Sequence, residues 1–419
     1  MIDRTVAPHL SPLSGIDFIE PFKRPLGEHA HLFWMNQVPD ETVKVELFFN
    51  AGTIRGKSAL AGMVNGMLFG GTANWTSREI QEKLDDLGAY LDQEMSLEKA
   101  IVNVYCLKEH LREVMEIVYQ AMHDAIFPEE EINLMVQEKK QRFQVSMEKV
   151  SFLARREFQQ RLFEADPDYG RLTEAADFDL VSRDEMIAFH QEYYLKGLKR
   201  IVVVADIPEE EIEWLASRFE DWTHPAPLEY LDQVSAQGGS YEVKKEGAIQ
   251  TAIRLGIPMF NKQHEDYLDV LILQTILGDY FGSRLMSNIR EDKGYTYGVG
   301  SALIELNRVG YLIVVTEVAS QVADDTLKEI RKEFERLQHE EVGAEELDLV
   351  KNYMVGQLLK SADGAGAMMD LFVGVERFGL DMSFYQNYLN RINSVQAEDI
   401  RRMAVKYLDW SNFIIIKAG

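Results

Sequence analysis

Residues 56–72 read GKSALAGMVNGMLFGGT, a stretch rich in small residues that predicts a short helix followed by a turn. Gly62, Gly66 and Gly70 are four residues apart, so they would share one face of that helix. Each glycine is about 1 kcal/mol less favourable in a helix than alanine, and this loss needs compensation. Two explanations stay open: close packing against a neighbouring element, or a smooth wall facing a peptide-binding chamber.

The order of elements around this stretch occurs twice in the 419 residues. A strand, helices, two alternating strands and two further helices follow one another in each half of the chain. The offset is roughly 210 residues, far longer than the ~20–50 residues of solenoid repeats, so the pattern indicates a duplicated domain. We therefore predict an α+β fold of two homologous tandem domains, each a largely antiparallel sheet with helices packed on it.

Prolines followed by Gln-Gly-Gly-Ser between residues 223 and 243 are typical of a linker. The predicted division is an N-terminal domain at 1–225, a linker at 226–243 and a C-terminal domain at 244–419. Residues 364–370, GAGAMMD, are glycine-rich and predict an exposed, mobile connection before a helix.

Composition excludes several classes of function. The chain has 69 acidic and 44 basic residues and a formal charge of −25, which argues against a nucleic-acid partner. Its single cysteine, Cys106, allows no intramolecular disulfide and alternates with Val102 and Val104 on the predicted buried face of a strand. The first residues lack a signal-peptide pattern, and no apolar run approaches the ~20 residues that span a bilayer. We expect a cytoplasmic protein with no membrane partner.

A nucleotide site is one reading of the region just before the predicted helix. Ala51–Ser58, AGTIRGKS, fits a loose P-loop pattern, and the apolar run that ends at Asp206 could supply a magnesium-binding carboxylate. Two features weaken it: Ala51 replaces the first glycine, and a P-loop protein needs one parallel sheet with crossover helices. A P-loop NTPase remains a lesser alternative.

The stretch also resembles the insulinase/pitrilysin family of zinc peptidases, which includes mitochondrial processing peptidase and reads approximately G-L-A-H-F-L-E-H-M-L-F-K-G-T. This chain keeps seven of those positions: Leu60, Ala61, Met67, Leu68, Phe69, Gly71 and Thr72. The resemblance covers nearly the whole chain, including the closing helix and strand of residues 395–419.

The resemblance implies that the zinc site of this chain is degenerate. In H-x-x-E-H the two histidines bind Zn²⁺ and the glutamate acts as general base. Gly62 stands at the first ligand position, Asn65 at the glutamate and Gly66 at the second ligand. The third ligand position, on a later helix, falls at Arg142, with Glu138 one turn earlier. None of the nine histidines has another four residues away, so we expect no metal on this chain.

The second half keeps a different part of the family pattern. Residues 283–301 read SRLMSNIREDKGYTYGVGS, in which Arg290 and Tyr297 match an arginine–tyrosine pair of the family. The resemblance implies that the pair grips the substrate backbone and stabilises the tetrahedral intermediate. Without it, Arg290 would simply complement a helix C-terminus and Tyr297 would be a half-buried strand aromatic.

Together these features resemble the non-metal-binding partner in split members of the family. The resemblance implies a heterodimeric zinc peptidase that hydrolyses peptides inside a clamshell, with zinc held by a homologous subunit bearing H-x-x-E-H. This chain would be inactive alone and would supply Arg290 and Tyr297 in trans. A non-catalytic peptide-binding or scaffold protein is the alternative.

Overall fold

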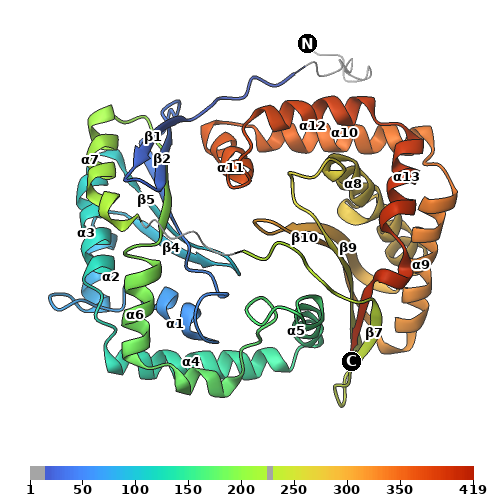
Figure 1. Ribbon diagram of the computed structural model, residues 1–419, viewed down its shortest axis with the longest axis horizontal. Coiled ribbons are helices and arrows are strands. Elements are labelled where there is room, and N and C mark those ends of the chain that lie inside the picture. The colour runs from blue at the N-terminus through green and yellow to red at the C-terminus, as the bar shows by residue number, and fades with distance from the viewer. Residues whose placement is uncertain (1–14, 224–229) are drawn as a thin grey trace, which may run out of the picture.

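The structure, a computed structural model, describes residues 15–223 and 230–419, and it contains two sheets that face each other with helices outside them (Figure 1). The first sheet has the strand order β1-β2-β6-β3-β5-β4. Its strands are β1 (Phe22–Leu26), β2 (Ala30–Met35), β3 (Thr42–Phe49), β4 (Tyr90–Met95), β5 (Ala100–Leu107) and β6 (Leu198–Val204). β2 and β6 run parallel, and the other neighbouring strands of this sheet run antiparallel.

The second sheet has the order β7-β11-β8-β10-β9. Its strands are β7 (Gly239–Val243), β8 (Gln250–Met259), β9 (Thr296–Glu305), β10 (Gly310–Ala319) and β11 (Ile414–Ala418). Here β7 and β11 are the parallel pair and the remaining pairs are antiparallel. The α+β class with two largely antiparallel sheets is therefore confirmed. β7 forms from the last residues of the expected linker at 226–243, of which 226–229 lie outside the described residues, and the domain boundaries stay a prediction.

The first half of the chain contributes the following helices. They are α1 (Leu60–Gly66), α2 (Ser77–Asp86), α3 (Leu111–His123), α4 (Glu129–Met147), α5 (Val150–Leu162), α6 (Arg183–Tyr193) and α7 (Glu209–Phe219). α2 shows how local sequence sets their bounds. Thr76 caps its N-terminus in a capping box with Glu79, and Gly88 follows its end at a φ of +62°.

The second half is covered by α8 (Tyr267–Gln274), α9 (Ala323–His339), α10 (Ala344–Ser361), α11 (Ala365–Glu376), α12 (Ser383–Ser394) and α13 (Ala397–Tyr407). Between α8 and β9 the chain forms two π-helical segments, η4 (Thr275–Asp279) and η5 (Met286–Asp292), where the sequence predicts ordinary helix. Among the described residues, none of the helices combines the length and the apolar character needed to span a bilayer.

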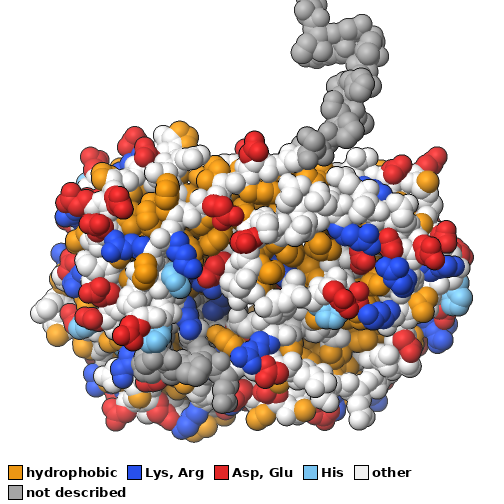
Figure 2. Space-filling view, turned by 45° about the horizontal axis from the view of Figure 1, so that its top comes forward, with side chains coloured by type: hydrophobic (Ala, Val, Ile, Leu, Met, Phe, Trp, Pro, Cys, Tyr) orange, Lys and Arg blue, Asp and Glu red, His pale blue; other side chains and the backbone are white. Residues whose placement is uncertain are grey.

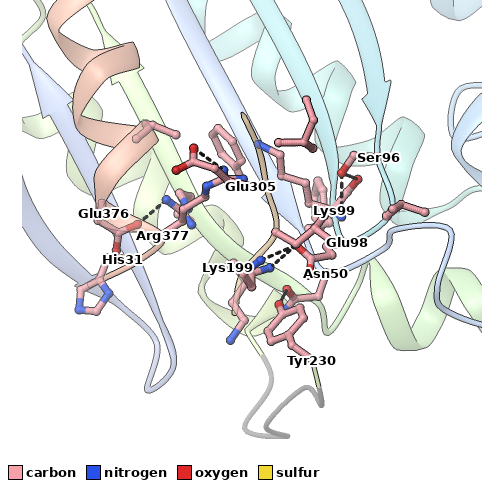
Figure 3. A pocket seen from close by; sticks show the side chains of 18 of the residues that line it. His31, Asn50, Ser96, Glu98, Lys99, Lys199, Tyr230, Glu305, Glu376 and Arg377 are labelled. Carbon is pink, nitrogen blue, oxygen red and sulfur yellow. Dashed lines mark hydrogen bonds and ion pairs between the residues drawn. The ribbon is translucent and has the colours of Figure 1, made fainter. Parts of the chain in front are cut away.

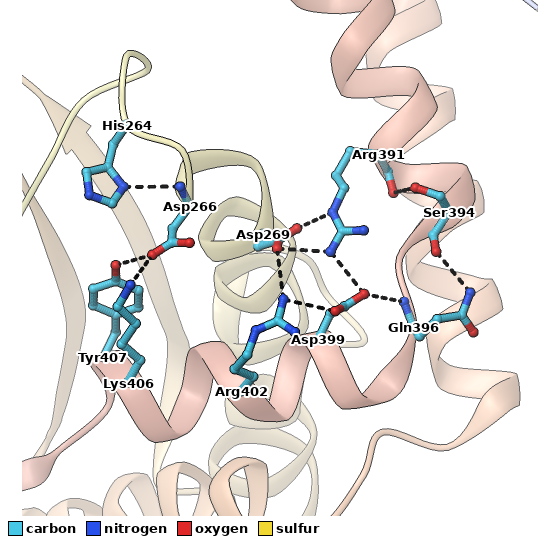
Figure 4. Close-up of polar contacts among 10 residues, drawn as sticks. All are labelled: His264, Asp266, Asp269, Arg391, Ser394, Gln396, Asp399, Arg402, Lys406 and Tyr407. Carbon is cyan, nitrogen blue, oxygen red and sulfur yellow. Dashed lines mark hydrogen bonds and ion pairs between the residues drawn. The ribbon is translucent and has the colours of Figure 1, made fainter.

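Polar contacts hold α13 against α8 and α12 (Figure 4). Arg391 of α12 donates to the Asp269 carboxylate of α8 at 2.9 Å and lies 3.0 Å from the Asp399 carboxylate of α13. Arg402 bridges the same two carboxylates from α13, and Lys406 and Tyr407 reach Asp266. The network therefore fixes the outer layer of the second half.

The two halves exchange helices. α5, which belongs to the first half by sequence, packs its buried Phe158 on the second sheet, where Gly256 leaves room for the ring. In the reciprocal position α11 packs on the first sheet, and Phe372 lies 4.9 Å from Phe33 between ring centroids. The expectation of an exposed connection at 364–370 is wrong, because α11 begins at Ala365 and its side chains enter this shared core.

Candidate functional site

The motif helix α1 is packed by methionines on its glycine face. The Cε atom of Met135, in α4, lies 3.0 Å from the place where a side chain at Gly66 would begin. The Cε atom of Met95, in β4, lies 3.4 Å from the same point at Gly62. The glycines therefore allow two flexible side chains to lie against the helix, which supports the packing explanation of their spacing.

Asn65, at the glutamate position of the motif, is absorbed into the core. It is 7% exposed, and its Oδ1 accepts a hydrogen bond of 2.9 Å from the hydroxyl of Tyr194, which follows α6. Its backbone carbonyl accepts from Gln93 at 2.6 Å. A buried amide with these partners is a structural element, because an amide side chain is too weak a base to take a proton from water as a glutamate does.

The residues at the zinc positions do not fit a zinc ion. Gly62 and Gly66 carry no donor atom, and Arg142 on α4 is 72% exposed and forms an ion pair with Glu138. Within residues 15–223 and 230–419, no three His, Cys, Asp or Glu side chains converge as a metal site. Three converging donors are the minimum for a protein zinc site, and this region lacks them.

The P-loop reading also fails on geometry. The backbone amides of Thr53 and Ile54 donate to carbonyl oxygens of the β4–β5 turn, both at 3.0 Å, so they do not face a phosphate. Lys57 forms an ion pair with Glu185. β6, which ends just before Asp206, runs antiparallel to β3, whereas the nucleotide fold needs parallel strands. Ala51–Ser58 is a turn that joins β3 to α1.

Arg290 and Tyr297 lie on either side of one tight turn. Arg290 is in the last turn of η5, Gly294 turns the chain at a φ of +64°, and Tyr297 follows in β9. Tyr297 is 96% exposed and is therefore not a half-buried strand aromatic. The guanidinium of Arg290 lies 4.8 Å from the ring centre of exposed Phe281 and its Nε 3.5 Å from Glu291. Both donors are accessible on rigid elements.

A separate pocket of about 520 Å³ lies between the two halves (Figure 3). The first half supplies the start of β2, the end of β3, the β4–β5 turn and the start of β6, and the second half supplies the β9–β10 turn and the end of α11. Sequence reasoning missed it because the lining residues run from His29 to Arg377. His29 and His31, two residues apart, are among these lining residues.

Comparison with known proteins agrees with this architecture. Residues 33–164 match the family described as "Insulinase (Peptidase family M16)", and residues 180–354 match the "Peptidase M16 inactive domain". An uncharacterized zinc protease of Bacillus subtilis is 23% identical over 81% of this chain and 83% of its own length. One from Rickettsia felis is 24% identical over 81% and 82%.

Solved structures show the same fold at low identity. The peptidase M16 inactive domain from Pseudomonas fluorescens superposes with a TM-score of 0.86 at 20% identity, covering 96% of this chain and 98% of that one. A protease from Helicobacter pylori gives 0.79 at 16% identity, covering 96% and 100%. Two tandem domains of this type, matched along most of their length, leave one assignment: the chain belongs to the insulinase family of peptidases, M16.

Proposed function

We propose that this chain is the metal-free subunit of a two-chain zinc peptidase, whose homologous partner carries the H-x-x-E-H motif. The supporting observation is an asymmetry between the halves. The motif positions of the first half carry no zinc donors, whereas Arg290 and Tyr297 of the second half are accessible around one turn. Such a chain would depend on a partner for zinc, and its Arg290 and Tyr297 side chains could donate hydrogen bonds to the substrate.

The residues of this chain would act on the substrate carbonyl. A zinc ion in the partner would supply the activated water. The Arg290 guanidinium is a permanent cation and the Tyr297 hydroxyl a donor, so both can stabilise negative charge that develops on the carbonyl oxygen. Tyr297 lies on β9, an edge strand of the second sheet, and an extended peptide that pairs with this edge would bring its backbone to the tyrosine.

The test is to isolate the tagged chain from its native lysate and to measure zinc and hydrolysis of an unfolded peptide in the eluate. We expect a zinc-bearing homologue to co-purify, with activity that Arg290→Ala abolishes while the two chains stay together. A chain that elutes alone without zinc or activity contradicts the proposal. Full activity in the Arg290→Ala complex contradicts the role of the pair.

A peptide-binding protein without catalysis is the second candidate, because the Arg290 surface carries two exposed aromatic rings. Phe281 is 63% exposed and Tyr297 96%. Fluorescence anisotropy of a labelled unfolded peptide with the isolated chain separates the two candidates. Binding that Tyr297→Ala abolishes, with no zinc partner in the native lysate, favours the binding protein.

A further inference from the structure

The pocket between the two halves is large enough for a small molecule. Its volume of about 520 Å³ lies within the ~300–1,000 Å³ typical of such sites. Lys99, Lys199 and Arg200 line it from the first half and Arg377 from the second. In the space-filling view, Lys and Arg side chains gather at the hollow between the halves (Figure 2).

The carboxylates that line this pocket are already engaged. Glu98 is 5% exposed and accepts three hydrogen bonds, from the Tyr169 hydroxyl at 2.7 Å and from the backbone and side-chain nitrogens of Asn307 at 2.9 and 2.8 Å.

The other two carboxylates are held in ion pairs. Glu376 pairs with Arg200, and Glu305 pairs with Lys262 and lies 3.6 Å from Arg377. No lining carboxylate is therefore left for the lysines.

The lysines of the pocket have no such partners. Within the described part of the chain, neither Lys99 nor Lys199 has a carboxylate at ion-pair distance, and the Lys99 ammonium lies 5.3 Å from the Phe48 ring centre. Nε of Arg377 has no hydrogen-bond partner among the described residues. The lysines and arginines that line the pocket therefore outnumber its carboxylates by four to three, in a protein with a formal charge of −25.

Burial and the neighbouring arginines both affect the protonation of Lys99. Burial, followed by repulsion from Arg377 and Arg200, lowers the pKa of Lys99 to about 8, and the carboxylates Glu94 and Glu46 only partly oppose the shift. Burial and Arg200 lower the pKa of Lys199 in the same way, against Glu376. An anion in the pocket would raise both pKa values, because it favours the charged ammonium.

We propose that the pocket binds a small, multiply charged oxyanion of the phosphate or polycarboxylate type. Guanidinium groups suit the paired oxygens of such anions, and lysine ammoniums neutralise their charge. Because the cations come from both halves, the ligand would also fasten one half to the other. This site is independent of the proposed peptidase role.

The test uses calorimetry and thermal melting of the full chain with pyrophosphate in one arm and citrate in the other, against sodium chloride of equal ionic strength. We expect saturable binding, a higher melting temperature and uptake of protons near pH 8. Lys99→Met should weaken binding about tenfold, since one charged contact is lost. The matched control is Lys196→Met, an exposed lysine three residues before Lys199 that does not line the pocket.

Each outcome decides the proposal. Binding of both anions supports the shared oxyanion chemistry, and binding of one alone assigns its type. Absence of binding, or equal binding by the Lys99→Met and parent proteins, overturns it. Without ligand, Lys99→Met is expected to raise the melting temperature because it removes an uncompensated charge, and a fall would overturn the premise.

Discussion

The two halves of this molecule treat different parts of one family pattern in opposite ways. In the first half Asn65, at the position of a general base, is 7% exposed and bonded to Tyr194. In the second half Tyr297, which matches the tyrosine of the family's arginine–tyrosine pair, is 96% exposed on an edge strand. The side chain at the general-base position has been taken into the core, whereas Tyr297 stays accessible to solvent.

The difference in burial predicts which property each residue affects. A buried, hydrogen-bonded asparagine between methionine-packed glycines contributes to stability, and its loss should be visible in unfolding. An exposed tyrosine contributes almost nothing to folding, so replacing it should leave stability unchanged and report only on binding or catalysis. Substitutions at Asn65 should therefore change stability, and substitutions at Tyr297 should change activity.

The largest effect is expected at the exposed pair. In the assembled two-chain enzyme, Arg290→Ala and Tyr297→Phe should each lower kcat about 10²–10³-fold, as removal of one oxyanion donor does. The melting temperature should not change, because Tyr297 is exposed. The control is Tyr90→Phe, an exposed tyrosine on β4, the corresponding edge strand of the first sheet. Equal activity of the Tyr90 and Tyr297 variants would contradict a functional role for Tyr297.

The second effect is a pH dependence confined to the first half. His190 in α6 is 2% exposed, its Nε2 has no partner among the described residues, and its ring lies between Phe127 and Tyr194. Burial, with a smaller contribution from His123, lowers its pKa to about 4, and a hydrogen bond with the Met122 backbone opposes this only in part.

Between pH 6.5 and 4 the unfolded chain therefore binds a proton that the folded chain does not. The free energy of unfolding should fall as the pH falls through this window, by about 3 kcal/mol in total. His190→Phe should remove this part of the pH dependence, with the carboxylates common to both proteins as background. Tryptophan fluorescence is a suitable probe, because Trp34, Trp75, Trp214 and Trp222 belong to the first half. Parallel curves for the two proteins would show that His190 titrates normally.

A third, smaller effect concerns the bond that holds Asn65. Asn65→Leu leaves the buried Tyr194 hydroxyl without its acceptor and should cost about 1–3 kcal/mol of unfolding free energy. The double variant with Tyr194→Phe should recover most of this loss, since both polar groups are then gone. Chemical denaturation of the four proteins gives the coupling energy. A double variant no more stable than Asn65→Leu would mean that the asparagine acts by its shape alone.

Much of this architecture could be predicted from local sequence, and the exceptions have one physical cause. The Thr76 capping box, the alternating β4 and the buried Cys106 of β5 all depend on nearby residues. Burial raises the pKa of the Cys106 thiol to about 11, as expected for a core residue. The exposure of Tyr297 and the packing of Met369 depend on residues far away in sequence, and periodicity does not report these.

The candidate sites also differ in how far local sequence predicts them. The loss of zinc donors at Gly62 and Gly66 is a matter of residue identity and could be read directly. The pocket between the halves could not be read, because Lys99 and Arg377 meet only after the halves have exchanged α5 and α11. Sequence patterns predict the elements of each half, but they do not predict which residues of the two halves meet at the junction.

The smallest expected effect tests whether the two halves unfold independently of each other. Glu98 of the β4–β5 turn accepts two hydrogen bonds from Asn307 of the β9–β10 turn and one from Tyr169 of its own half. Glu98→Gln replaces one acceptor oxygen by a donor, so at least one of these bonds is lost, at about 1–2 kcal/mol. Tyr169→Phe is the matched control, because it leaves both Asn307 bonds in place and removes the bond to Glu98 together with a long 3.5 Å bond from the Leu231 amide. We expect unfolding followed by tryptophan fluorescence and by circular dichroism to coincide in the parent and in Tyr169→Phe, and to separate in Glu98→Gln. Coincident curves in all three would mean that the exchanged helices alone couple the halves, so that the contrast between them is one of surface and not of independent folding.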